Sequence, residues 1–519
     1  MKDLMKLLPL VFAAVSCTGF FNSVGEIVDV MGDVPHEMIV LGDRLEDPYS
    51  VENMTKALES LYSTKADRTP LSTTDYYVRF LPGTDEEFDR LEGMGVEMLD
   101  HPVDYEIVRE GDYYHDPEIP EDHITWQYAV VDKDFVFPDG IEYEVLDECF
   151  ISEHSTTKAD WVDWESVERE AFRLTGNGNM LSASTKAGGS GPSGRITIAD
   201  DSLDGKESGL KGVTVSCNVF VKFAKAFTDE DGNYRMSRTF SSDPRYRILF
   251  KNKKGFGIGF NLLLVPASFS TLGKGPASGI SLAIDSNSER KLFTRAVVNN
   301  AAYDYYESCK SEDSSIKTPP SNLRIWLFQN MDASSATMLQ QGVAVDGSTL
   351  SEFLGVYSSL VKMFLPDITL GLKGKESCSD LFAVTVHELA HASHFMQVGV
   401  EYWNAYVKFI LFSFVTSGFV TYGVGTEENH GYCEVGEMWA YYLETQMMKE
   451  RYGTDREYGT SYWFYPQIFS KLDERGINRY RIFNALTSDV KDKEMLQKKL
   501  ISLFPESKSI INQAFGKYN

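Results

Sequence analysis

The sequence predicts a multidomain α+β protein, and three features of the chain indicate this class. Its 519 residues exceed what one hydrophobic core normally organises. Short alternating strand patterns dominate the middle of the chain, whereas helical spacing dominates its last part. A Ser/Gly/Lys-rich stretch from Ser182 to Gly194 has the composition of a linker. The expected boundaries are 1–17 for a signal segment, 18–74 for a tether with one helix, 75–150 for a small α+β module, 151–193 for a helix and linker, 194–265 for a β-sandwich, and 280–519 for a mainly helical domain with a small sheet.

Composition and charge narrow the possible classes of partner. The chain is 43% hydrophobic, which is typical of a globular protein, and its formal net charge is −26. Nucleic-acid binding needs a basic surface that neutralises phosphates, so this charge argues against it. Apart from Cys17 there are five cysteines without C-x-x-C spacing, and because five is odd we expect at least one free thiol. These are Cys149, Cys217, Cys309, Cys378 and Cys433.

The N-terminus has the features of an export signal. A short charged start precedes an apolar run from Leu7 to Val15, which is too short to anchor the chain by spanning a membrane. The run ends in Ala14-Val15-Ser16-Cys17, which resembles a bacterial lipobox. This resemblance implies lipidation of Cys17 and an exported chain anchored at the outer membrane, either on the cell surface or facing the periplasm. An ordinary secretory signal is the alternative.

The module expected at 75–150 begins with a strand at Tyr76–Leu81. Thr84 or Asp85 can cap the helix that follows, and a second strand is expected at Val96–Leu99. This order loosely resembles small α+β propeptides and inhibitory prodomains, although a generic packing or docking module fits the pattern better. Three histidines in the loops, His101, His115 and His123, are expected to be solvated surface residues.

The middle of the chain has the pattern of an all-β module. The pieces Gly194-Arg195-Ile196, Leu210–Val215 and Thr228-Asp229-x-Asp231-Gly232-x-Tyr234 resemble the carboxypeptidase regulatory-like (transthyretin-like) β-sandwich. The resemblance covers about 194 to 265 and implies a module without chemistry of its own. Asp229 lies in a predicted turn, since the later ligands of a calcium loop are missing.

The remaining part of the chain is predicted to be mainly helical. The order of helices and strands leads to a helix that contains Val384–Ala392 and is capped by Ser379 or Asp380. The hydrophobic stretch Tyr402–Val420 is interrupted by polar residues and is expected to be a buried core helix rather than a membrane span. The other expected elements are helices at Trp161–Leu174, Glu289–Ser308 (capped by Ser288) and Leu350–Phe364, and strands at Leu323–Phe328 and Asp367–Leu372.

The feature that indicates function is His387-Glu388-Leu389-Ala390-His391, with uncharged and mostly apolar flanks. On a helix the two histidines lie one turn apart on the same face, so both imidazoles can reach one metal ion. Glu388 lies beside them, where its carboxylate can accept a proton from water at the metal. The alternative is a buried helix that carries two histidines by chance.

A catalytic zinc site needs a third protein ligand. The metzincin pattern is excluded, because His394 stands where that pattern has Gly and Gln397 where it has the third His. His394 lies two turns from His387, too far to share its metal ion, so we expect it behind the ligands or in the cleft. Downstream, Glu437 is the favoured ligand and Glu434 its rival, and whichever does not bind the metal can support a ligand histidine.

Glu437-Met438-Trp439-Ala440 resembles the Glu-x-x-Ala of gluzincin aminopeptidases. With the His-Glu-x-x-His motif, residues 280–519 therefore resemble a zincin metallopeptidase of the gluzincin branch. The resemblance implies Zn²⁺ held by His387, His391 and Glu437, peptide hydrolysis with Glu388 as general base, and a last strand before the metal helix that edges the cleft. Candidates for the donor that stabilises the oxyanion are His430, placed first because it lies in a Gly-containing loop near the ligand helix, and Tyr441 and Tyr442.

The whole layout of lipobox, regulatory-like sandwich and zincin motif resembles surface lipoproteins of gut Bacteroidota. It implies a zinc peptidase with a protein or peptide substrate and leaves the oligomeric state open. One alternative is a non-catalytic surface binding lipoprotein with a degenerate zincin domain, against which the intact Glu388 counts. Another is a zinc amidase that acts on peptidoglycan or a glycoprotein.

Overall fold

The computed structural model describes residues 37–62, 70–120, 123–155, 161–182, 191–259, 269–310, 316–330, 332, 334–343, 366–416 and 422–518. These residues form a mixed α+β structure, which confirms the fold class at this level. The signal segment with Cys17, residues 183–190 of the linker and the helix expected at Leu350–Phe364 lie outside the described residues. The five other cysteines are all buried free thiols. The sequence predicted at least one free thiol, because their number is odd.

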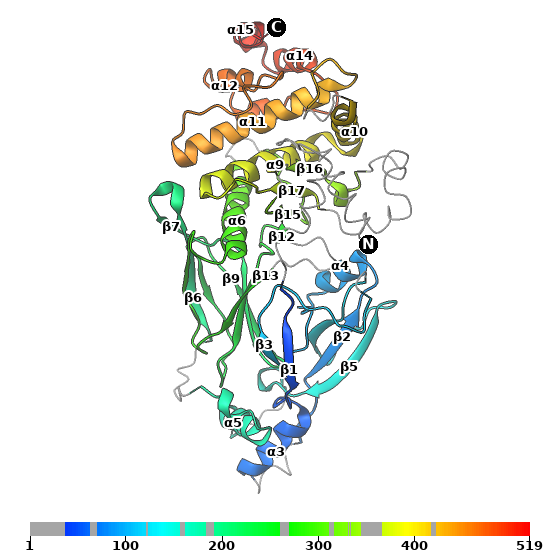
Figure 1. Cartoon of the computed structure of the whole chain (residues 1–519), viewed down its shortest axis with the longest axis vertical. Coiled ribbons are helices and arrows are strands. Elements are labelled where there is room, and N and C mark those ends of the chain that lie inside the picture. The colour runs from blue at the N-terminus through cyan, green and yellow to red at the C-terminus, as the bar shows by residue number, and fades with distance from the viewer. Residues whose placement is uncertain are drawn as a thin grey trace.

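The molecule is elongated, with helices at both ends and sheets between them (Figure 1). At one end α3 (Val51–Tyr62) packs against α5 (Trp164–Leu174). α3 is the one helix expected within 18–74, and α5 confirms most of the helix predicted at Trp161–Leu174. At the other end lie α9 (Cys378–Val398) and α11 (His430–Tyr452). α6 (Arg290–Ser308) extends from the sheets to α9.

The N-terminal module is built around β2 (Asp75–Leu81), the central strand of a three-stranded antiparallel sheet. The helix that follows, α4 (Asp85–Gly93), is also present as predicted. The Thr84 hydroxyl caps α4 by accepting a hydrogen bond from the Glu87 N–H at 3.2 Å. The strands beside β2 are β4 (Gln127–Asp132) and β5 (Glu142–Cys149), and a separate pair is formed by β1 (Val40–Arg44) and β3 (Tyr105–Arg109).

Two predictions for this module are wrong. Val96–Leu99 is not a strand, because β4 and β5 occupy both edges of β2, and Leu99 pairs only through an isolated bridge to Tyr128. His101 is buried rather than solvated, with 6% of its surface exposed and Nδ1 2.8 Å from the Asp100 carboxylate. The burial of a loop residue depends on tertiary packing, which a local pattern does not encode.

The strand-rich middle of the chain forms two four-stranded sheets, here called the two-sheet unit. Apolar side chains of both sheets, such as Ile196, Val215 and Tyr246, are buried in one core. One sheet contains β6 (Ser193–Asp200), β7 (Lys206–Gly209), β10 (Asn233–Arg235) and β14 (Leu282–Ile284), and the other contains β8 (Thr214–Val219), β9 (Lys222–Phe227), β11 (Arg245–Leu249) and β13 (Phe269–Lys274).

The two-sheet unit differs from the prediction in two places. The strand expected at Leu210–Val215 begins only at Thr214, because Gly212 has a φ of +68° and turns the chain between β7 and β8. The unit also continues past residue 265 to Ile284, since β14 pairs in parallel with β6. The turn predicted around Asp229 is present.

A smaller sheet of order β12-β15-β17-β16 lies beside the two-sheet unit. β15 (Arg324–Phe328) and β17 (Ile368–Gly371) confirm two predicted strands. β12 (Gly257–Gly259) comes from the range expected to belong to the sandwich, but it pairs in parallel with β15. β16 (Ser335–Ala336) pairs antiparallel with β17 and forms the edge on that side. β17, the last strand before the metal helix and the one expected to edge the cleft, is therefore an inner strand of this sheet.

Two helices begin at caps other than those predicted. α6 is capped by Glu289 instead of Ser288. α9 is capped by Ser377 instead of Ser379 or Asp380, because the Ser377 hydroxyl accepts from the Asp380 N–H at 3.1 Å. The path of the chain before each helix decides which side chain reaches the first free N–H groups.

α10 (Val400–Thr416) confirms most of the core helix predicted at Tyr402–Val420, of which residues 417–420 lie outside the described part. Tyr402, Trp403 and Tyr406 are buried. Among the described residues, no helix combines the length and the apolar composition that a membrane crossing requires. The chain ends in short helices at Gln467–Asp473, Arg479–Phe483, Lys493–Leu503 and Lys508–Gly516.

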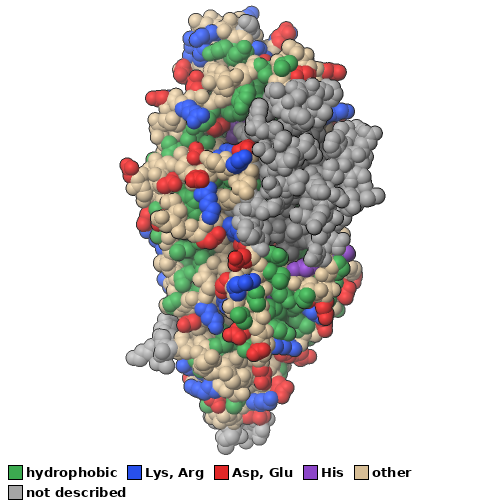
Figure 2. Space-filling view, viewed as in Figure 1, with side chains coloured by type: hydrophobic (Ala, Val, Ile, Leu, Met, Phe, Trp, Pro, Cys, Tyr) green, Lys and Arg blue, Asp and Glu red, His purple; other side chains and the backbone are tan. Residues whose placement is uncertain are grey.

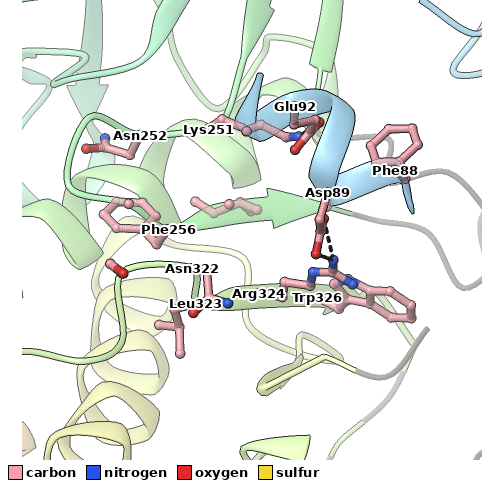
Figure 3. A pocket seen from close by; sticks show the side chains of 16 residues that line it. Phe88, Asp89, Glu92, Lys251, Asn252, Phe256, Asn322, Leu323, Arg324 and Trp326 are labelled. Carbon is pink, nitrogen blue, oxygen red and sulfur yellow. Dashed lines mark hydrogen bonds and ion pairs between the residues drawn. The ribbon is translucent and has the colours of Figure 1, made fainter. Parts of the chain in front are cut away.

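The N-terminal module docks on the rest of the chain through pairs of opposite charge. Asp89 of α4 binds Arg324 at 2.7 and 2.8 Å, and Glu92 pairs with Lys251. Both pairs lie at a cavity of about 420 Å³ between α4 and the strands opposite (Figure 3). The N-terminal module supplies the acid of both pairs, and it does so again in Glu97–Arg247, Glu110–Arg245 and Asp112–Lys291.

On the face of the molecule in Figure 2, acidic and basic side chains are interspersed.

Candidate metal centre

The candidate site lies between α9 and α11, which pack side by side in opposite directions. Near one end, the rings of Phe382 and Tyr452 are 5.7 Å apart. Further along, Trp439 Nε1 donates to the Ala390 carbonyl at 3.1 Å. Both helices are buried along most of this contact. Polar side chains between them are therefore enclosed by protein.

Three of the side chains singled out in the sequence meet there. His387 Nε2 and His391 Nε2 each lie 3.5 Å from a different oxygen of Glu437. One possible ligand atom from each residue lies within 4.8 Å of the other two, and all three residues are buried. Two imidazole nitrogens and one carboxylate oxygen are a donor set found in catalytic zinc sites.

A second carboxylate supports His387 from behind. Glu444 Oε2 lies 3.0 Å from His387 Nδ1, so this bond directs Nε2 toward Glu437. The sequence analysis missed this role. Glu444 follows Glu437 by seven residues, or two helical turns, and this spacing on one face was a signal that could have found it.

A tyrosine from the intervening helix supports Glu437. The Tyr406 hydroxyl of α10 donates a hydrogen bond to Glu437 Oε1. Its ring lies 5.9 Å from the His391 ring. Gly436 of α11 faces this ring, and a Cβ atom there would be in ordinary van der Waals contact with Tyr406 Cζ, at 3.5 Å. This contact was also missed, since no spacing rule relates two helices joined by a long connection.

Glu388 lies next to these ligands without a partner of its own. It is fully buried, and among the described residues neither of its carboxylate oxygens has a hydrogen-bond partner. Burial raises the pKa of Glu388 to about 8, and the negative charges of Glu437 and Glu444 act in the same direction, whereas His387 and Lys375 oppose it. The carboxylate is thus free to bind a molecule that enters the site.

Charge pairing holds the cluster together. Burial alone lowers the pKa of His387, but its contacts with Glu437 and Glu444 raise it to about 10. Burial opposes ionisation of Glu437, yet His391 and His387 hold the pKa of this carboxyl well below its ordinary value. A bound cation can take the place of the imidazole proton in such a cluster.

His394 lies outside the cluster, as its spacing from His387 indicated. Its ring is buried against Tyr402 and Trp403 of α10, at centroid distances of 5.5 and 5.7 Å. Burial lowers the pKa of His394 to about 3, so the ring is neutral. Within the described residues neither ring nitrogen has a hydrogen-bond partner.

Glu434, the rival third ligand, points elsewhere. Its Oε2 accepts from the Lys493 N–H at 3.1 Å, and Oε1 lies 3.5 Å from Lys493 Nζ. Glu434 is not part of the cluster formed by the two motif histidines and Glu437. The structure therefore places Glu437, rather than Glu434, next to both imidazoles.

The three candidate oxyanion donors lie in different surroundings. The ring of Tyr441 is 4.4 Å from that of His387, and its hydroxyl lies 3.1 Å from the Tyr422 hydroxyl. The Tyr442 hydroxyl donates to Asp473 at 2.6 Å, away from the cluster. His430 begins α11, about 10 Å along the helix from Glu437, and its Nδ1 lies 2.8 Å from the Glu427 carbonyl. Of the three, the structure brings only Tyr441 against a residue of the cluster.

The donor set and its surroundings fit a metal ion. His387 Nε2 is buried without a hydrogen-bond partner among the described residues, although it lies 3.5 Å from Glu437. A bound ion is one of the partners that can satisfy a buried nitrogen of this kind. Comparison of the chain with protein-family models, curated proteins and solved structures finds no match. A functional argument therefore has to come from these side chains.

Proposed function

We propose that this protein is a zinc-dependent metallopeptidase of the gluzincin type that hydrolyses peptide bonds. The observation that carries the proposal is the buried cluster of His387, His391 and Glu437 beside the open carboxylate of Glu388. These three ligands leave a fourth position of a tetrahedral metal for another molecule. Zn²⁺ held there would polarise the peptide carbonyl and lower the pKa of a water molecule.

The protein's own groups have distinct roles in this proposal. Glu388 accepts a proton from the attacking water and returns it to the leaving amine. Glu444 fixes the tautomer of His387, because its carboxylate accepts a hydrogen bond from Nδ1–H. Tyr406 holds Glu437 through Oε1. Of the candidate oxyanion donors His430, Tyr441 and Tyr442, we favour Tyr441, whose ring lies against His387. The Tyr406 hydroxyl is a further candidate, because it already lies at a ligand.

The same proposal places the enzyme outside the cytoplasm on a lipid anchor at Cys17. It rests on the lipobox-like residues Ala14 to Cys17. Replacing Cys17 with Ala should move the protein from the membrane fraction to the soluble periplasm or medium. A variant that still fractionates with membranes contradicts the anchor without affecting the metal site.

The test of the proposed chemistry is Glu388→Gln. This substitution keeps the size of the side chain but removes the base, so peptide hydrolysis should fall by about 10² to 10⁴-fold. Zinc content, measured by atomic absorption after removal of loosely bound metal, should stay at one ion per chain. Full activity in this variant would refute the assignment of the base.

Substrate tests separate this proposal from the two alternatives. Casein, mucin glycoprotein and peptidoglycan are incubated with the full chain, with and without a zinc chelator. Chelator-sensitive cleavage of casein supports the peptidase, whereas cleavage of peptidoglycan alone supports an amidase. Zinc binding without cleavage of any substrate supports a binding protein.

A further inference from the structure

We infer that the turn after β6, formed by Asp200, Asp201 and Ser202, is a clamp that sets the relative position of the two metal-bearing helices. The inference rests on the proposed zinc site and extends it. It assigns residues that position the metal ligands to the two-sheet unit, a module that was expected to have no chemistry of its own. The clamp touches the start of α9 and the end of α11 together.

The turn itself is fixed by its own backbone. Asp200 Oδ1 accepts from the Ser202 N–H at 3.0 Å, and the Gly205 N–H donates to the Asp200 carbonyl at 2.9 Å. Asp204 then adopts a left-handed conformation with φ of 53°. With Oδ1 engaged inside the turn, Asp200 Oδ2 is directed outward to its other partners.

The clamp first holds the beginning of α9, the helix of the two histidines. The Cys378 N–H donates to Asp201 Oδ1 at 2.8 Å, and the Ser379 N–H donates to Ser202 Oγ at 3.1 Å. These two N–H groups belong to the first turn of α9, where backbone N–H groups have no acceptor within the helix. A carboxylate there also interacts favourably with the helix dipole. His387 follows nine residues later, roughly 14 Å along the axis.

The clamp also holds the end of α11, the helix of Glu437. Arg451 Nη2 and the Tyr452 hydroxyl both donate to Asp200 Oδ2 at 3.1 Å. Arg451 Nη1 donates to Asp304 Oδ2 of α6 at 2.9 Å. The Arg451 guanidinium lies over the Phe382 ring of α9, 5.0 Å from its centroid. Asp200 is only 3% exposed, so its carboxylate is shielded from water, whereas the Arg451 side chain is partly exposed.

A clamp at this place controls the metal ligands because the two helices run in opposite directions. Near the ligands, two hydrogen bonds join α9 and α11 directly, Trp439 to the Ala390 carbonyl and His387 to Glu444. The rest of their contact is mostly apolar and therefore non-directional. Metal–ligand distances tolerate only about 0.2 Å. The clamp adds directional bonds at the far ends of both helices, so that their register, and with it the distances from His387 and His391 to Glu437, is held at both places.

The same contacts explain a second group of possible ligands, Asp200, Asp201 and Cys378, whose side-chain atoms lie within 4.8 Å of one another. Both carboxylates already accept hydrogen bonds, from the Arg451 side chain and from the Cys378 N–H. A cation there would meet a bound guanidinium. The group is therefore a structural joint between the two-sheet unit and the metal helices, and we do not assign it a metal.

The experiment uses the full chain, stripped of metal and titrated with Zn²⁺ and, for its visible spectrum, Co²⁺. Asp200→Ala and Asp201→Ala should raise the Zn²⁺ dissociation constant about tenfold, as expected when support of a ligand is lost. The Co²⁺ absorption bands should change in position or intensity, because they report ligand geometry. Asp201→Asn keeps an acceptor oxygen and should restore most of the affinity.

Asp229→Ala is the matched control. Asp229 also caps a turn of the two-sheet unit, accepting from the Asp231 and Asn233 N–H groups, but its hydrogen bonds reach neither metal helix. Folded clamp variants whose Zn²⁺ affinity and Co²⁺ spectrum equal those of this control would overturn the clamp. A loss of affinity in Asp201→Ala that Asp201→Asn restores supports it. A wild-type chain that binds no Zn²⁺ overturns the zinc site itself, which is a distinguishable result.

Discussion

Two clusters of buried charge in this molecule are completed in different ways. Between α5 and β9, Lys222 Nζ binds Glu168 at 2.8 Å and Glu153 at 3.1 Å, and the Tyr49 hydroxyl donates to the other oxygen of Glu168 at 2.7 Å. Between α9 and α11, both oxygens of Glu388 lack a hydrogen-bond partner among the described residues. The first cluster is closed by the protein's own groups, whereas the second is left open.

This difference separates a structural network from a candidate site. An unpaired buried carboxylate costs free energy that a paired one recovers. The closed cluster therefore needs nothing further to be stable. The open one is consistent with a bound ion and water in the working protein. If the two clusters differ in this way, substitutions in the open one should affect metal binding and substitutions in the closed one should affect stability.

The largest effect is expected from Glu437→Gln. Loss of the charged ligand should weaken Zn²⁺ binding by more than about a hundredfold, beyond the range for residues that only support a ligand. Competition with a chromophoric chelator measures this constant. Glu434→Gln is the control on the same helix, and since Glu434 binds Lys493 it should leave the constant unchanged. A larger loss in the control would make Glu434 the ligand.

The second effect tests the closed cluster. Lys222→Met removes the cation and leaves Glu168, only 5% exposed, with an unneutralised charge. Removal of one partner of a buried pair typically destabilises a protein by about 3 to 5 kcal/mol. The midpoint of urea unfolding should fall accordingly, while Zn²⁺ affinity should not change. Lys56→Met, which breaks the exposed pair with Glu52, is the control and should leave the midpoint unchanged.

The two regions also differ in how far the sequence revealed them. His387 and His391 follow from one short motif, because helical spacing alone brings them together. The prediction of Glu437 as third ligand depended on a downstream helix with apolar and aromatic neighbours. Only the structure decided between Glu437 and Glu434. The partner of Glu434, Lys493, lies 59 residues further along the chain. A contact of this range leaves no local pattern.

The clamp and the closed cluster illustrate the same limit. β6 lies in the range predicted to form a β-sandwich, but nothing in the local sequence shows that Asp200 meets Arg451, 251 residues later. Likewise, Lys222 and Glu168 lie in separately predicted segments whose docking was unknown. The strand predicted at Val96–Leu99 failed for a related reason, since the edges of β2 were already occupied. Local periodicity predicts elements, whereas side-chain partners depend on how the elements pack.

Within the described part of the chain, a buried carboxylate oxygen without a hydrogen-bond partner also occurs outside the candidate metal site, at Asp47. Asp47 lies near the closed cluster; its Oδ1 accepts from the Tyr49 N–H at 2.9 Å, while Oδ2 has no hydrogen-bond partner among the described residues. Burial raises the pKa of Asp47 to about 8. The folded chain thus holds this proton more tightly than the unfolded chain, and stability from this group falls as pH rises from about 4 toward 8.

Asp47→Asn removes this titration. Between pH 5 and pH 7 the wild type should lose roughly 3 kcal/mol through Asp47, at about 1.4 kcal/mol per pH unit, and the variant should not. Urea unfolding at both pH values measures the difference, which should grow in favour of the variant. Equal pH dependence in both proteins would mean that Asp47 is ionised in the fold. Among the described residues Asp47 belongs to neither group of possible metal ligands, so unchanged Zn²⁺ affinity is expected throughout.

The smallest effect distinguishes two tyrosines of the open cluster. The Tyr406 hydroxyl donates to Glu437 Oε1, whereas the Tyr441 hydroxyl contacts that of Tyr422 at 3.1 Å. Tyr406→Phe should therefore weaken Zn²⁺ binding about tenfold, because the ligand carboxylate loses its partner. Tyr441→Phe should leave Zn²⁺ affinity unchanged. If Tyr441→Phe instead lowers kcat at full zinc occupancy, the Tyr441 hydroxyl acts as the oxyanion donor. If His430→Ala lowers kcat in this way, His430, the first candidate from the sequence, has that role.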